Sequence, residues 1–186
     1  MTYTFAGPPA ATVFTTVHGS HLYGLNHEGS DLDIFTITTS PAPKARQGIR
    51  DNLDTATVGF ETFLRRATTG SHQSAEALFS PYKQWHSHTE LAPFLDGLRI
   101  GGGAVAAKYE RTIRSFTHGD FKKRRHAARL ALNLDQLRRF GRFTPVLTES
   151  EKAYINEAAN LTEERLLDAL FNYLPSFPPA PSLSRE

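Results

Sequence analysis

Two aspartates, Asp31 and Asp33, lie two residues apart at the start of the segment DLDIFTIT, residues 31–38. The alternation of apolar and polar residues predicts a β-strand, in which residues two apart project from the same face. Two neighbouring carboxylates repel each other, and a hard divalent cation such as Mg²⁺ relieves that repulsion. The pair therefore predicts a metal site that phosphate groups and water would complete.

A small polar turn precedes this strand. Residues 12–17 (TVFTTV) are β-branched and aromatic and predict a first strand, which ends at His18 and Gly19, before Ser20 begins a short helical turn. Gly19 allows the backbone to approach a phosphate closely, and Ser20 offers a hydroxyl and an N–H at the start of a short predicted helix. We expect this turn to bind phosphate beside Asp31 and Asp33.

Together these residues resemble a known pattern. Gly19-Ser20 followed by Asp31-Leu32-Asp33, with apolar strands on both sides, is similar to the DNA polymerase β nucleotidyltransferase superfamily. Residues 19–37, 60–81 and 122–134 resemble, in the same order, the predicted nucleotidyltransferases of bacteria and their phages. The resemblance implies a mixed sheet flanked by helices and two Mg²⁺ or Mn²⁺ ions. It also implies transfer of a nucleoside monophosphate from a nucleoside triphosphate, with release of pyrophosphate.

The superfamily normally uses a third carboxylate, which this sequence does not mark with a sharp motif. Asp54 begins a predicted third strand, residues 53–58, and we choose it as the third metal ligand and catalytic residue beside Asp31 and Asp33. Glu61 and Glu76 lie on predicted helices and remain the alternatives.

A long basic helix is predicted for residues 122–140. At about 100° per residue, Lys122, His126, Arg129 and Asn133 form one polar stripe beside an apolar stripe of leucines. We expect Lys122 and Arg129 to bind the triphosphate, and His126 to bind phosphate or to donate a proton to the leaving pyrophosphate. A solvated helix face is the alternative interpretation of this stripe.

Composition narrows the chemistry. The 186 residues include no cysteine, which excludes disulfides and thiolate zinc sites and favours Mg²⁺ or Mn²⁺ held by oxygen ligands. The formal charge is only +2, so overall charge is a weak argument for a polyanionic partner. No apolar run is long enough for a membrane helix, and the first residues lack signal-peptide blocks. We expect a soluble, cytoplasmic protein with no membrane partner.

The pattern of segments predicts an α/β (α+β) fold. We expect a nucleotidyltransferase core with a short mixed sheet in residues 1–81, and a helical region in residues 82–174 that completes the cleft. Residues 41–52 contain prolines, a glycine and charges, which favour a mobile loop. Residues 175–186 are proline-rich and predict a disordered tail.

The sequence leaves several alternatives open. The acceptor hydroxyl could belong to an RNA or tRNA end, to a protein or to a small molecule, and neither the preferred nucleotide nor the oligomeric state follows from the residues. A different class is a catalytically inactive nucleic-acid-binding protein that keeps the fold and uses the basic helix for phosphate contacts.

Overall fold

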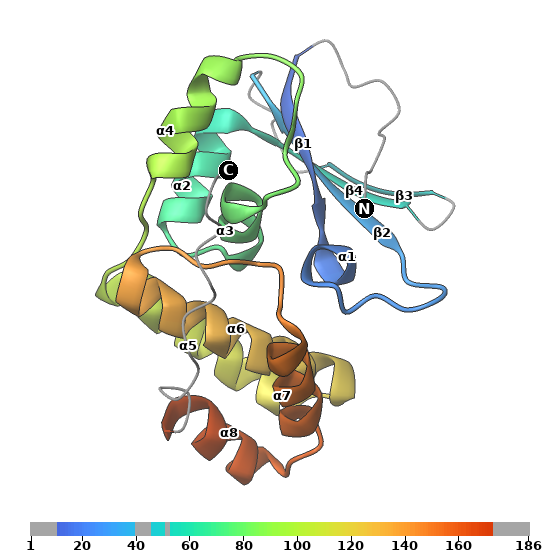
Figure 1. The fold of residues 1–186 in the computed structure, drawn as a ribbon, viewed down its shortest axis with the longest axis vertical. Helices are drawn as coiled ribbons and strands as arrows, with labels where there is room; N and C mark the ends of the chain where they lie inside the picture. Colours follow the sequence, from blue (N-terminus) through green and yellow to red (C-terminus); the bar gives the residue numbers. More distant parts are fainter. Residues whose placement is uncertain (1–10, 40–45, 51–52, 173–186) are drawn as a thin grey trace. The chain divides into compact units, whose positions relative to one another are not determined.

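The computed structural model describes residues 11–39, 46–50 and 53–172, which form two compact units, Met1–Leu98 and Arg99–Glu186 (Figure 1). The described part of the first unit contains a β-sheet and helices, whereas that of the second unit contains only helices. The fold is therefore mixed α+β with a C-terminal helical region, as the sequence predicts. The predicted tail, residues 175–186, lies outside the described residues.

The sheet has five strands in the order β3-β4-β2-β1-β5. Strands β2 and β4 are parallel and every other neighbouring pair is antiparallel, so the sheet is mixed. The strands are β1 (Thr12–His18), β2 (Leu32–Thr38), β3 (Arg46–Arg50), β4 (Leu53–Gly59) and β5 (Gln84–Trp85).

Strand β3 corrects the prediction of a mobile loop for residues 46–50, while residues 41–45 and 51–52 lie outside the described residues. Its backbone pairs with β4 along its whole length, from Arg46 opposite Thr57 to Arg50 opposite Leu53. β3 is an edge strand that pairs with one neighbour through backbone hydrogen bonds. The segment lacks the alternation of apolar and polar residues by which a half-buried strand is recognised in a sequence.

Two helices, α2 (Phe60–Thr68) and α3 (His72–Phe79), pack on one face of the sheet. The ring of Phe14 in β1 meets the edge of Phe63 in α2 at 5.7 Å between centroids. Two residues further along the same face, the Thr16 hydroxyl donates a hydrogen bond to Ser80 Oγ, directly after α3, at 2.6 Å. His18 is the next residue of β1 on this face, which therefore points toward α3.

The first unit extends to Leu98, beyond the boundary predicted after residue 81. Trp85 in β5 pairs with Phe14 in the sheet, and their rings lie 5.2 Å apart. The short helix η1 (Thr89–Leu91) and α4 (Ala92–Gly97) follow, with Leu95 fully buried. A two-residue strand is too short to produce a recognisable sequence pattern, so the prediction assigned this segment to the helical region.

The second unit contains α5 (Gly103–Thr117), α6 (Phe121–Phe140), α7 (Glu149–Ala159) and α8 (Glu163–Asn172). Helix α6 contacts the other three, and every residue from 127 to 134 is buried. It begins after Asp120, whose side chain accepts a hydrogen bond from the Lys123 N–H, and ends at Gly141 as predicted. No helix in the described ranges combines the length and apolarity that a membrane span requires.

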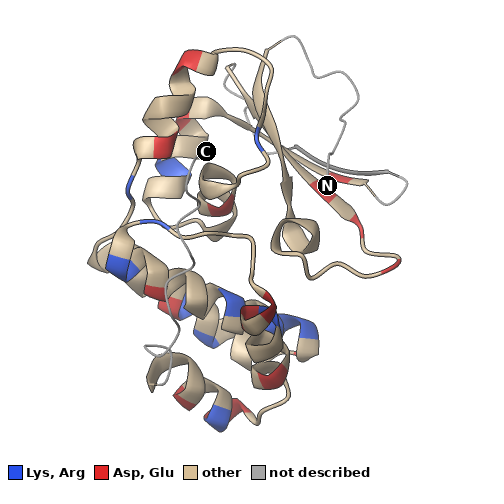
Figure 2. Cartoon of the chain, in the orientation of Figure 1, with Lys and Arg blue, Asp and Glu red and all other residues tan. Residues whose placement is uncertain are grey.

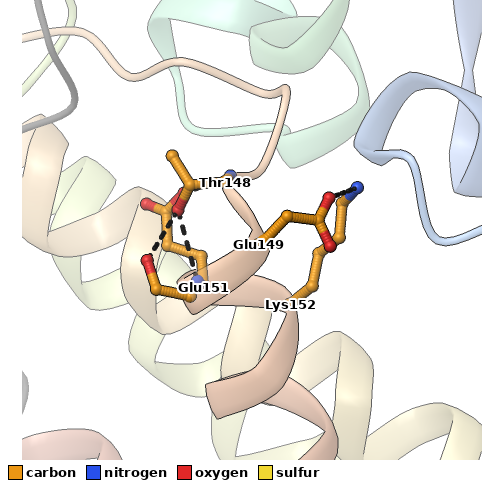
Figure 3. A network of polar contacts seen from close by, with 5 residues as sticks. Thr148, Glu149, Glu151 and Lys152 are labelled. Carbon is orange, nitrogen blue, oxygen red and sulfur yellow. Dashed lines mark hydrogen bonds and ion pairs between the residues drawn. The ribbon is translucent and has the colours of Figure 1, made fainter.

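Helix α7 begins directly after Thr148, which forms a capping box with Glu151 (Figure 3). The Thr148 hydroxyl oxygen accepts a hydrogen bond from the Glu151 N–H at 3.2 Å, and Glu151 Oε2 accepts one from the Thr148 N–H at 2.8 Å. Lys152 Nζ also lies 2.7 Å from Glu149 Oε1. The two hydrogen bonds between Thr148 and Glu151 satisfy backbone donors that the start of a helix leaves unpaired.

Candidate active site

Three titratable side chains from three neighbouring strands lie in one row across the sheet. Asp33 in β2 is the register partner of Asp54 in the parallel strand β4 and of His18 in the antiparallel strand β1. Register partners project from the same face, so all three point toward the side of α2 and α3. The predicted third strand thus brings Asp54 beside Asp33. Asp31 directly precedes β2 and is exposed.

A pocket of about 170 Å³ lies on this face of the sheet. It is smaller than the roughly 300–1,000 Å³ typical of pockets that enclose a whole small molecule, so it fits only part of a nucleotide. Its lining residues are His18, Asp33, Ile34, Phe35, Asp54, Ala56, Arg66 and Gln73.

Three polar lining residues, His18 from β1, Arg66 from α2 and Gln73 from α3, were not among the predicted site residues. Arg66 follows the buried Phe63 by three positions and therefore borders the apolar stripe of α2. That spacing is a signal that the side chain lies near the sheet. Gln73 carries no comparable signal, because its place depends on how α3 packs.

Position 19 requires glycine for two reasons, its backbone conformation and its close approach to Asp33. Its φ of +61° is in the left-handed region, and a Cβ at this position would lie 1.8 Å from Asp33 Oδ2 and 2.8 Å from Asp33 Cγ. The turn after β1 therefore lies directly against the Asp33 carboxylate. We predicted Gly19 as a phosphate contact, and the structure adds a steric reason for glycine that involves a predicted metal ligand.

Ser20 belongs to α1 (Gly19–Tyr23), the predicted short helix, and is half-buried. The helix ends at Gly24, and the N–H groups of both Gly24 and Leu25 donate to the Ser20 carbonyl oxygen. Five residues align few peptide dipoles, so the helix dipole adds little to phosphate binding. The expectation for Ser20 rests on its hydroxyl and N–H groups.

Burial raises the pKa of Asp33 above its ordinary value of 3.8. The positive charge available on His18 and His21 opposes this shift, while the negative charges of Asp54 and Asp31 add to it. The ionised form of Asp33 is therefore higher in free energy in the folded protein than it would be in water. A bound cation or a protonated imidazole would lower that free energy.

The carboxylates suit a metal that arrives with its substrate. Within residues 11–39 and 53–172, no group of three or more His, Asp or Glu side chains converges closely enough to hold an ion. Mg²⁺, however, often uses only one or two carboxylates together with substrate phosphates and water. The pair Asp33 and Asp54 fits that donor set.

Neither of the two alternative third carboxylates, Glu61 and Glu76, lines the pocket. Glu61 is exposed in the first turn of α2. Glu76 in α3 is 0% exposed, accepts a hydrogen bond from the Tyr23 hydroxyl, and its Oε2 lies 3.5 Å from His18 Nε2. Asp54 is therefore the carboxylate in register with Asp33.

The other predicted binding residues lie on α6 in the second unit. Lys122 is exposed, His126 is half-buried and Arg129 is only 1% exposed. Arg129 Nη2 donates to His126 Nδ1 at 2.8 Å, and the His126 ring stacks on Phe116 of α5. The predicted stripe is thus exposed only at its first turn, because α6 is buried on all sides from residue 127 to residue 134. Nucleotide binding by these residues stays a prediction.

Comparison with known proteins finds little likeness in sequence. No protein-family model and no curated protein matches the chain. Among solved structures, the chain is similar to a nucleotidyltransferase-like protein from Exiguobacterium sibiricum 255-15. The identity is 13%, the match covers 87% of this chain and 67% of that one, and the TM-score is 0.37. The functional argument therefore rests on the residues of the site.

Proposed function

We propose that this protein is a metal-dependent nucleotidyltransferase that transfers a nucleoside monophosphate from a nucleoside triphosphate to a hydroxyl acceptor. The observation that carries the proposal is the register of Asp33 with Asp54, next to the turn that brings Gly19 against Asp33. Two carboxylates on one sheet face and a glycine turn beside them are what a metal-bound phosphate substrate needs.

Asp33 and Asp54, with Asp31 at the edge of β2, would hold two Mg²⁺ or Mn²⁺ ions. When bound, such ions lower the pKa of the attacking hydroxyl and neutralise charge on the triphosphate. Ser20 would donate hydrogen bonds to a phosphate oxygen from its hydroxyl and N–H groups. Arg66, which also lines the pocket, offers a planar cation for another phosphate oxygen.

The reaction is an in-line displacement at the α-phosphorus. The acceptor oxygen forms a bond to that phosphorus, and the bond from the α-phosphorus to the oxygen of the leaving pyrophosphate breaks. The acceptor proton passes to solvent or to a nearby base. His18, which lines the same pocket, is a candidate for that base.

The test is incubation with each labelled nucleoside triphosphate, Mg²⁺ or Mn²⁺, and total RNA, DNA and protein as acceptors. We expect metal-dependent pyrophosphate release and one labelled class of product. Asp33→Asn and Asp54→Asn should reduce both to background. Asp135→Asn is the matched control, since Asp135 pairs with Arg139 on α6 in the other unit. Full activity in Asp54→Asn would remove Asp54 from the mechanism.

The second candidate is a nucleic-acid-binding module without catalysis. It is favoured by the first turn of α6, where Phe121 is 46% exposed beside exposed Lys122 and Lys123 (Figure 2). Basic and aromatic side chains together suit a nucleic-acid strand. This candidate predicts binding that weakens steeply with salt and needs no metal. A metal-dependent nucleotide affinity would favour the enzyme.

A further inference from the structure

Glu76 is a fully buried carboxylate that the proposed reaction does not use. It lies in the middle of α3, and its side chain reaches the sheet face that carries His18. The Tyr23 hydroxyl donates a hydrogen bond to Glu76 Oε2, and His18 Nε2 lies 3.5 Å from the same oxygen. A carboxylate in such a place lowers the stability of the fold unless polar partners compensate its lost hydration.

The two partners of Glu76 flank one short segment. His18 is the last residue of β1 and directly precedes Gly19, while Tyr23 is the last residue of α1. One buried oxygen therefore contacts the chain on both sides of the turn that holds Gly19 and Ser20. Only four residues separate His18 from Tyr23, so fixing both ends leaves the backbone between them little freedom.

We propose that Glu76 is a positioning residue that holds the β1–α1 turn against the Asp33 carboxylate. Gly19 approaches Asp33 so closely that a methyl group does not fit between them. A small displacement of the turn would therefore change the position of Asp33 relative to Ser20. The catalytic part of this inference rests on the proposed function, whereas the structural part does not.

The first arm of the experiment measures hydrogen exchange and does not require catalytic activity. The Gly24 and Leu25 amides donate to the Ser20 carbonyl oxygen, so their hydrogen exchange in the unliganded protein reports on α1. We expect Tyr23→Phe and Glu76→Ala to exchange about ten-fold faster at these amides, the scale of one lost hydrogen bond. Glu76→Gln should lie between them and the unchanged protein, because its amide oxygen still accepts from Tyr23.

Glu110→Gln is the matched control. Glu110 pairs with Arg138 between α5 and α6 in the second unit, so this variant makes the same chemical change away from the turn. Its exchange at Gly24 and Leu25 should equal that of the unchanged protein. Equal exchange in Tyr23→Phe as well would overturn the proposal, and this variant decides the matter if Glu76→Ala does not fold.

The second arm measures kcat/KM for pyrophosphate release with Mg²⁺, well below the unfolding temperature, from the nucleoside triphosphate and acceptor that the unchanged protein uses among those tested above. We expect Glu76→Ala to lose about ten-fold or more, and Glu76→Gln to recover part of the loss. A purely structural role would lower the melting temperature and leave kcat/KM unchanged, which would overturn the positioning role. If the unchanged protein releases no pyrophosphate, the proposed function fails, and the exchange arm still decides whether Glu76 holds the turn.

Discussion

Replacing Gly19 with alanine would place a methyl group 1.8 Å from Asp33 Oδ2. The Asp33 side chain is short, and a methyl group at this position would also lie 2.8 Å from its Cγ and 3.3 Å from its Cβ. The carboxylate therefore has to rotate away, or the backbone of the turn has to move. Either change alters the site, so we expect Gly19→Ala to lose nucleotide turnover while the protein still folds.

The stability cost has two parts. A left-handed backbone at φ +61° costs alanine about 1–2 kcal/mol. Displacing the carboxylate adds about 1–3 kcal/mol, the usual cost of overpacking. In an Asp33→Ala background the carboxylate is absent, so the backbone cost of about 1–2 kcal/mol remains together with one tight contact, 3.3 Å to the Cβ of residue 33. The coupling between the two substitutions is thus about 1–3 kcal/mol.

Urea unfolding of the unchanged protein, both single variants and the double variant measures this coupling. Trp85 is the only tryptophan, it belongs to the first unit, and its ring packs on Phe14, so its fluorescence reports on the unit that contains the site. Equal destabilisation by Gly19→Ala in both backgrounds would refute the reasoning, because the Asp33 carboxylate would then not be the obstacle.

Three further predictions concern the same protein. The raised pKa of Asp33 means that its ionised form costs stability, a cost absent below about pH 3.8 and growing as pH rises through the folded-state pKa. Urea unfolding followed by Trp85 fluorescence should therefore give Asp33→Asn a higher free energy of unfolding than the unchanged protein at pH 7, and no increase at pH 3. A lower free energy of unfolding at pH 7 would contradict this prediction. Ser20→Ala should weaken nucleotide affinity by about 1–2 kcal/mol in calorimetric titration, and unchanged affinity would exclude the turn from phosphate binding. Arg129→Ala should lower the free energy of unfolding by about 1–3 kcal/mol, because Arg129 is buried and bonded to His126, whereas the exposed Lys122→Ala should change it by less than about 0.5 kcal/mol. Thermal unfolding followed by circular dichroism compares the two variants, and equal stability would contradict the structural role of Arg129.

Much of the architecture could be predicted because it is encoded locally. Strands β1, β2 and β4 follow from β-branched and alternating residues, and α6 follows from the helical spacing of its residues. The same-face spacing of Asp31 and Asp33 is also a local property. Strands β3 and β5 could not be predicted in this way, since one is an edge strand and the other has two residues.

The site shows the same division. Residue types and spacing predicted Gly19, Ser20, Asp31 and Asp33 as site residues, and the family resemblance led to the choice of Asp54 as the third carboxylate. Their roles in binding and catalysis stay predictions. Only the tertiary structure decided that Asp54 lies in register with Asp33 and that Gly19 abuts its carboxylate.

The burial of Glu76 and Arg129 was likewise decided by packing. Both are charged residues on helices; helical spacing predicted Arg129 as a phosphate ligand, and the family resemblance made Glu76 an alternative third carboxylate. Glu76 instead contacts His18 and Tyr23, more than 50 positions away in the chain, and Arg129 lies where α6 is surrounded by its neighbours. A local pattern specifies how one segment folds, but which distant segment covers a side chain depends on contacts between them.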